Sequence, residues 1–210
     1  MMSEILKSGD LALLEKTLQQ NPQFANQGIE LNANSPLLAH PLHRLCDYVW
    51  EGQLSQNKAI ELATFLINQG SDINGFAPKP FQDTPLIAAA SMYLSDLGEF
   101  YLSQGADTHI QGCYGGTALH WAAWCGLPSL VKKLIPLSVD LNQKCFEYEA
   151  TPLFWSIHGL KQDKRSSRAN HLACVKHIVE SGANLHIPNK EGLSVFDLMA
   201  TDTEVLTILK

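Results

Sequence analysis

Internal repetition constrains what this chain of 210 residues can fold into more than any other feature. A seven-residue phrase begins at Thr84 (TPLIAAA), returns at Thr117 (TALHWAA) and returns again at Thr151 (TPLFWSI), so the copies are 33 and 34 residues apart. A second phrase, an apolar stretch closed by a small residue, follows each copy, as at Gly105 and Gly182. A unit of this length cannot bury its own apolar face, so successive units must stack and share a core.

Each repeated unit carries the signals of two consecutive helices. Thr84 suits the N-cap of a first helix, and Pro85 fits its first turn, where the missing N–H is not needed. Paired alanines then allow neighbouring helices to approach closely, and leucines and isoleucines supply the apolar stripe of a second helix. Gly105 suits a left-handed cap at the end of that helix. The pattern therefore predicts an all-α fold of stacked helix–turn–helix units with projecting loops.

The two phrases resemble the ankyrin repeat, which has Thr-Pro-Leu-His at its first helix and Leu-Leu-x-x-Gly-Ala at the end of its second. The resemblance covers nearly the whole chain. It implies an all-α ankyrin-repeat solenoid of about six repeats, including incomplete units that cap both ends. We expect a single domain over residues 1–210, with units at about residues 1–31, 32–74, 75–109, 110–142, 143–186 and 187–210.

Two units are longer than the others, by about nine residues around 52–58 and about ten around 159–170. Both insertions are predicted to lie between the two helices of their unit. The segment 160–168 (LKQDKRSSR) holds four of the chain's 15 basic residues. We expect a solvated loop that can be deleted at small cost, since long surface loops close at little entropic penalty. The alternative is a contact for an acidic or phosphorylated partner.

Composition excludes several classes of partner. A net charge of −6 and a pI near 5.7 argue against a general binder of nucleic acid or anionic membranes, which needs clustered basic charge. No uncharged apolar run approaches the ~18 residues of a membrane span. The five cysteines include no Cys-x-x-Cys pair, which is typical of reduced thiols in a cytosolic protein. We expect a cytoplasmic monomer that binds neither nucleic acid nor membrane.

The sequence offers little for catalysis or metal binding. His171, Cys174 and His177 have the ligand types of a zinc site, but their spacing places the two histidines about 240° apart on a helix. We therefore expect Cys174 in the core and the histidines at the surface. No nucleophile elbow, phosphate-binding glycine loop or His-Glu-x-x-His motif is found. We expect no catalytic, cofactor-binding or metal-binding residues.

The ankyrin resemblance points instead to a non-catalytic module that binds another protein. In that family, the two positions after the paired alanines face the concave groove, and the loop before each capping threonine forms a projecting finger. Aromatic residues and methionine are enriched at protein interfaces. The partner-binding candidates are therefore Tyr48, Met92, Trp124, Cys125 and His158 in the groove, and Phe81, Asp83, Tyr114 and Tyr148 on the fingers.

Other roles for the same residues remain open. The finger rings could simply cover neighbouring finger backbone. The surface could join copies of the chain in a structural or self-assembling subunit. His158 and Cys125 could serve an enzyme or a small-ligand site in the groove. Trp121 and Trp155, which share one repeat position, are expected in the core. The resemblance also implies that His43 and His120 bond to backbone groups.

Overall fold

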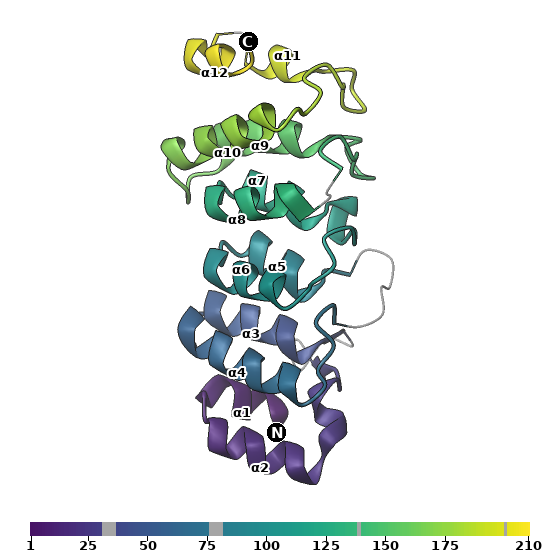
Figure 1. Cartoon of the computed structure of the whole chain (residues 1–210), viewed down its shortest axis with the longest axis vertical. Coiled ribbons are helices and arrows are strands. Elements are labelled where there is room, and N and C mark those ends of the chain that lie inside the picture. The colour runs from purple at the N-terminus through teal and green to yellow at the C-terminus, as the bar shows by residue number, and fades with distance from the viewer. Residues whose placement is uncertain (31–36, 76–81, 138–139, 200) are drawn as a thin grey trace. The chain divides into compact units, whose positions relative to one another are not determined.

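The structure, a computed structural model of the chain, describes residues 1–30, 37–75, 82–137, 140–199 and 201–210. These residues form twelve α-helices joined by loops and short turns, together with one two-stranded sheet (Figure 1). The chain divides into two compact units, Met1–Lys79 with Thr84–Asp107, and Pro80–Asp83 with Thr108–Lys210. The predicted all-α class is confirmed.

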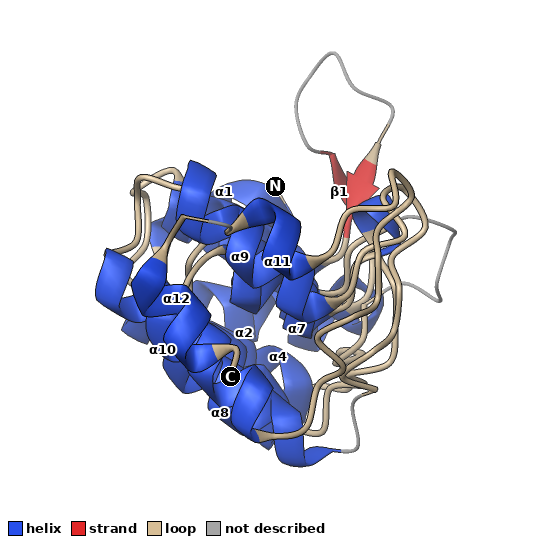
Figure 2. Cartoon of the chain, turned by 90° about the horizontal axis from the view of Figure 1, so that it is seen from above, coloured by secondary structure: helices blue, strands red, loops and turns tan. Residues whose placement is uncertain are grey.

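The first unit contains three helix pairs and the small sheet in its described residues. Its elements are α1 (Met2–Ser8), α2 (Leu11–Gln20), η1 (Pro22–Ala25), β1 (Ile29–Glu30), β2 (Leu38–Ala39), α3 (Pro41–Trp50), α4 (Gln56–Asn68), α5 (Pro85–Ser91) and α6 (Ser95–Ser103). Helix α3 contacts both α1 and α5, and α4 contacts α6, so successive pairs stack. Ile29 pairs with Ala39 in the antiparallel sheet, drawn in red in Figure 2.

The second unit repeats the arrangement in its own described residues. Its elements are η2 (Cys113–Gly115), α7 (Ala118–Trp124), α8 (Pro128–Leu134), η3 (Ile135–Leu137), α9 (Pro152–Gln162), α10 (Arg168–Glu180), α11 (Val195–Leu198) and α12 (Thr203–Ile208). Helix α7 contacts α9, and α8 contacts α10, so these pairs also stack. The helices of both compact units therefore follow one another in pairs along the chain.

The predicted threonines cap the helices that follow them. The Thr84 hydroxyl accepts a hydrogen bond from the Ile87 amide at 3.2 Å, and the Thr151 hydroxyl accepts one from the Phe154 amide at 3.3 Å. A proline follows each of these threonines in the first helical turn. Since each bond spans only three residues, the local sequence is enough to place these helix starts.

Two buried histidines complete other helix starts. The Nδ1 atom of His120 accepts the Thr117 amide at 3.1 Å, and its Nε2–H faces two backbone carbonyls at 3.1 and 3.2 Å. His40 uses the same tautomer: Nδ1 accepts the Leu42 amide at 3.3 Å and Nε2–H donates to the Asn26 side chain at 3.0 Å. Burial lowers the pKa of each imidazole to about 4. The structural role predicted for His120 is confirmed.

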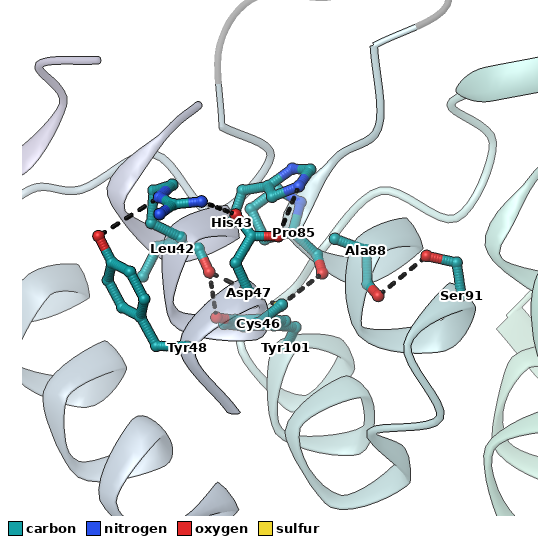
Figure 3. A network of polar contacts seen from close by, with 10 residues as sticks. Leu42, His43, Cys46, Asp47, Tyr48, Pro85, Ala88, Ser91 and Tyr101 are labelled. Carbon is teal, nitrogen blue, oxygen red and sulfur yellow. Dashed lines mark hydrogen bonds and ion pairs between the residues drawn. The ribbon is translucent and has the colours of Figure 1, made fainter. Parts of the chain in front are cut away.

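Side chains shared between helix pairs form the core of the first unit. The Tyr101 hydroxyl, on α6, donates to the Leu42 carbonyl on α3 at 2.8 Å, and the Cys46 thiol donates to the Pro85 carbonyl at 3.6 Å (Figure 3). Both Tyr101 and Cys46 are fully buried. Burial also raises the pKa of the Cys46 thiol, which is therefore a core group and not a reactive one.

The insertion at 159–170 is largely exposed to solvent, as the sequence suggested, but Asp163 and Ser166 anchor it to the rest of the second unit. It lengthens both helices, since α9 continues to Gln162 and α10 begins at Arg168. The Asp163 carboxylate between them accepts two backbone amides of the same loop at 3.0 and 3.1 Å. It also lies 3.1 Å from Nε2 of His171, and both side chains are at most 5% exposed. The Ser166 hydroxyl donates to the Gly126 carbonyl at 2.9 Å.

The expectation of a surface histidine at position 171 is therefore wrong. His171 is 1% exposed, because the insertion supplies a buried carboxylate partner for it. Burial lowers the pKa of this imidazole, although the Asp163 carboxylate acts in the opposite direction. Cys174 lies in the core as predicted.

Asp163→Ala is expected to lower the free energy of unfolding by about 3 kcal/mol. The change removes the acceptor of three hydrogen bonds, two of them partly buried, and a donor left unpaired away from water carries a desolvation penalty. Urea unfolding of the variant and of Lys164→Ala, an exposed residue of the same loop, measures the difference. The lysine variant should stay within about 0.5 kcal/mol of wild type. Equal, small effects would show that the contacts of Asp163 do not stabilise the fold.

Candidate functional site

An open cavity of about 470 Å³ in the second unit is walled mainly by aromatic side chains, and we refer to it as the aromatic pocket. Its polar lining consists of His158, Asn189 and Glu191. Small and apolar side chains of Ala150, Leu193 and Leu198 complete the wall. The six rings are those of Tyr114, Trp121, Trp124, Tyr148, Phe154 and Trp155.

Helices α7 and α9 place five of the twelve lining side chains. Trp121 and Trp124 are three residues apart on α7, and Trp155 and His158 are three residues apart on α9. Residues at this spacing share one face of a helix, so the two helices present these side chains to a common space. Gly159 lets α9 approach α7, because a Cβ atom there would lie 2.2 Å from the Trp124 carbonyl oxygen.

The rings hold one another at defined angles. Trp155 lies at the centre, with ring centroids 5.1 Å from Trp121, 6.4 Å from Trp124 and 6.4 Å from Tyr148. The planes of these three rings are inclined to that of Trp155 by 83°, 76° and 62°. Edge-to-face pairs of this kind are favourable contacts between aromatic rings. The pocket is therefore built before anything binds in it.

Loop contacts position Tyr114 and Tyr148, the two exposed tyrosines of the pocket lining. Their rings stack with centroids 5.9 Å apart and planes inclined by 29°. The Glu147 amide donates to the Tyr114 carbonyl at 3.1 Å, which joins the two loops next to the stacked rings. The Gln111 side chain bridges the same loops by donating to the carbonyls of Gly115 and Lys144 at 2.7 and 3.3 Å. These bonds hold Tyr114 and Tyr148 together.

The charged side chain in the lining of the aromatic pocket is acidic. Glu191 is the carboxylate among its lining residues, and the lining contains no lysine or arginine in the part of the chain that the structure describes. Partial burial, together with the nearby ammonium of Lys161, lowers the pKa of His158. The imidazole is therefore neutral near pH 7. Partial burial raises the pKa of Tyr148, so its phenol is also neutral there.

Four of the predicted partner-binding residues meet in the pocket: Tyr114, Trp124, Tyr148 and His158. Tyr114 and Tyr148 are 49% and 43% exposed, His158 is exposed and Trp124 is half-buried. Trp121 and Trp155, expected in the core, do pack against each other, but they also line the cavity.

The predictions that Tyr48 and Cys125 face solvent are wrong, since both are 0% exposed. Tyr48 lies within α3, which continues to Trp50, and its ring sits 4.5 Å from the Arg44 guanidinium, to which its hydroxyl is bonded at 3.3 Å (Figure 3). Trp50, two residues later, is 45% exposed instead. Cys125 follows the end of α7 and points into the core, where it influences the pKa of Cys174.

The remaining predicted residues lie elsewhere. Asp83 is half-buried and accepts the Cys113 amide at 2.8 Å, which gives it a structural role in the second unit. Met92 is half-buried after α5 in the first unit. Phe81 lies outside the described residues.

Glu191 is a pocket residue that the sequence interpretation missed, although the sequence contained a signal for it. Tyr114 and Tyr148 each lie three residues before a capping threonine. Glu191 lies three residues before Ser194, which caps α11 in the same way. Counting three residues back from the capping residue of this last, irregular repeat would have identified Glu191.

Neither a metal cluster nor a membrane helix is found in the part of the chain that the structure describes. There, no three His, Cys, Asp or Glu side chains are grouped so that they could hold one ion. None of the helices among the same residues combines the length and apolar character needed to cross a membrane.

Comparison with known proteins shows a consistent set of relatives. A family model for ankyrin repeats in three copies matches residues 53–145 and 92–189. The human protein named inhibitor of Bruton tyrosine kinase is 33% identical over 101 residues, which are 48% of this chain and 7% of that protein. The palmitoyltransferase AKR1 of Lachancea kluyveri is 26% identical over 93 residues, 44% of this chain and 11% of that protein. The chain thus spans only a small part of these curated relatives.

A solved structure shares the fold. The crystal structure of an ankyrin repeat domain from Acinetobacter baumannii superimposes with a TM-score of 0.72 at 24% sequence identity. The match covers 99% of this chain and 95% of the other.

Proposed function

Because the chain belongs to the ankyrin repeat family, we propose that it is a non-catalytic module that binds another protein, with the aromatic pocket as its docking site. Ankyrin repeats generally present their surfaces to protein partners. The observation that carries the proposal is the gathering of six aromatic rings around one open cavity.

The exposure of these rings supports a binding role. Tyr114 and Tyr148 keep more than two fifths of their surface in water while stacked on each other. Exposed apolar side chains that gather in one patch, rather than scatter singly, are typical of surfaces that bind a partner. Tyrosine and tryptophan also dominate binding energies at interfaces, since their large rings bury much area with few rotatable bonds.

Pre-formation of the pocket also favours binding. Ring contacts around Trp155 and the hydrogen bonds between the finger loops hold the lining in place. Less conformational entropy is then lost when a partner docks, which leaves more of the contact energy for affinity.

The alternative of groove chemistry by Cys125 and His158 is not supported. The Cys125 side chain is fully buried, whereas His158 is exposed on the pocket wall. A thiol that solvent and substrate cannot reach is not a usable nucleophile.

Replacing the two stacked tyrosines should remove partner binding. Peptides selected from a displayed random library on the wild-type chain are expected to bind the Tyr114→Ala, Tyr148→Ala double variant at least about thirtyfold more weakly. This is the size of effect typical of hot-spot rings, which contribute about 2 kcal/mol or more. Fluorescence polarisation with the selected peptides measures the loss.

The matched control is Trp50→Ala, which removes an exposed ring in the first unit and leaves the pocket intact. It should retain wild-type affinity. Selected peptides that bind the double variant as tightly as wild type would show that the pocket is not the docking site. A concentration-dependent dimer in light scattering, lost in the double variant, would show instead that the pocket joins copies of this chain.

A further inference from the structure

We infer that the aromatic pocket receives an arginine side chain of the partner, stacked on the pocket rings and paired with Glu191. The inference rests on the proposed protein-binding function and specifies the chemistry of the residue that enters the site. Three observations carry it: the kind of rings that line the cavity, the single carboxylate on its wall, and the absence of basic side chains among the described lining residues.

The rings provide the attraction for a cation. Five of the six belong to tryptophan or tyrosine, whose faces carry partial negative charge. Because Trp155 stands at 62–83° to three neighbouring rings, the cavity is walled by differently oriented π systems. The cluster already attracts one cation of its own chain: the Lys190 ammonium lies 5.5 Å from the centroid of the Tyr148 ring.

Glu191 provides the charge that a guanidinium would pair with. Its position is set by Asn189, whose side-chain oxygen accepts the amides of Glu191 and Leu193 at 3.0 and 2.9 Å. Across the described residues, the Glu191 carboxylate takes part in none of the ion pairs of the chain. A carboxylate offers two oxygens to the parallel N–H groups of a guanidinium.

Neighbouring lysines have other acceptors. The Lys190 ammonium lies 3.9 Å from the Glu147 carboxylate and also donates to that residue's carbonyl. The Lys161 ammonium donates to the Leu198 carbonyl at 3.1 Å. His158 adds no positive charge near neutral pH. Glu191, an exposed residue, is therefore the carboxylate of the pocket lining that is available to pair with a cation of the partner.

Arginine fits this environment better than other side chains do. Its planar guanidinium is weakly hydrated, stacks on aromatic faces and presents five donors. Lysine carries a compact, strongly hydrated ammonium, which loses more on entering an apolar cavity. A leucine would cover Glu191 without supplying a partner, and burying an unpaired carboxylate is costly. An acidic side chain would be repelled by it.

Capped single amino acids test the assignment without knowledge of the partner. N-acetyl-arginine N-methylamide is titrated into the ¹⁵N-labelled chain and followed at the indole N–H signals of Trp121, Trp124 and Trp155. The citrulline, lysine and leucine analogues are titrated in the same way. Wild type is expected to bind arginine about tenfold more tightly than its neutral isostere citrulline, as cation–π and charge-assisted contacts together predict.

Variants separate the pocket from the rest of the surface. Glu191→Gln should reduce the arginine-to-citrulline preference to about threefold or less, because ring stacking remains while the ion pair is lost. Glu180→Gln, which removes an exposed carboxylate of α10 outside the pocket lining, should leave the preference unchanged. The Tyr114→Ala, Tyr148→Ala variant should bind arginine more weakly than wild type.

Several results would overturn the arginine assignment. They are citrulline, leucine or lysine analogues that bind as tightly as arginine, an unchanged preference in Glu191→Gln, or no binding of any analogue to wild type. The peptide selection described above tests the docking function independently of the arginine assignment. If such peptides are selected but do not depend on arginine, the proposed docking function stands and only the arginine assignment fails.

Discussion

Gly159→Ala is expected to lower the free energy of unfolding by about 3 kcal/mol, although alanine is normally the better residue inside a helix. Helix propensity alone favours alanine by about 1 kcal/mol. In this structure, however, the added Cβ would lie 2.2 Å from the Trp124 carbonyl oxygen and 3.0 Å from its Cα atom. Backbone atoms cannot rotate away as a side chain can, so α9 must move off α7.

The same displacement should disturb the aromatic pocket, because Trp124 and His158 lie at this contact with ring centroids 4.9 Å apart. Urea unfolding and near-ultraviolet circular dichroism measure the two effects. Gly182→Ala is the matched control: the added Cβ meets nothing within 4 Å, and only the positive φ of +90° is unfavourable. It should cost about 1–2 kcal/mol. A Gly159→Ala variant that is more stable than wild type would contradict the close approach of α7 and α9.

Acid is expected to destabilise the chain through His40 and His120. Their pKa is about 4 in the folded state, against 6.5 for a free imidazole, because both rings are buried. Between these values the unfolded state binds more protons, so stability is fully present above about pH 6.5 and is lost as the pH falls towards 4. At 1.36 kcal/mol per pKa unit, each histidine should account for about 3 kcal/mol.

The tautomer that both rings adopt acts in the same direction as burial. In each, Nδ1 accepts a backbone amide of the helix start, and a proton on that atom would remove the acceptor. Urea unfolding at pH 7 and pH 4 should show that His40→Gln and His120→Gln lose about 3 kcal/mol less than wild type over this range. NMR titration of the wild-type imidazoles gives their pKa directly. A value near 6.5 for His120 would contradict the prediction.

Much of the fold could be predicted because its signals are local or periodic. The caps at Thr84 and Thr151 depend on hydrogen bonds that span three residues, and the repeat spacing alone indicates that helix pairs must stack. The positions of Tyr114 and Tyr148, three residues before each cap, followed from the same regularity.

Predictions failed where a helix length or a distant partner decided the outcome. Helix α3 runs on to Trp50, so Tyr48 stays inside it and is buried beside Arg44. The insertion at 159–170 reads as a polar loop in the sequence. Its Asp163 carboxylate nevertheless lies 3.1 Å from Nε2 of His171, eight residues away on the next helix. A charge count along the sequence cannot show that a carboxylate has a buried partner.

The sequence by itself determined the repeating helical pattern, the helix starts and the aromatic character of the finger and groove positions, since these depend on residues within one unit. Only the tertiary structure decided which of those residues share a site. Tyr114, Tyr148, Trp124 and Trp155 come from two successive repeats, and α9 packs closely on α7 at Gly159. Glu191 comes from the next repeat and joins them because α11 packs on α9. That distance is set by side-chain volumes on both helices, a property of their packing that no single repeat contains.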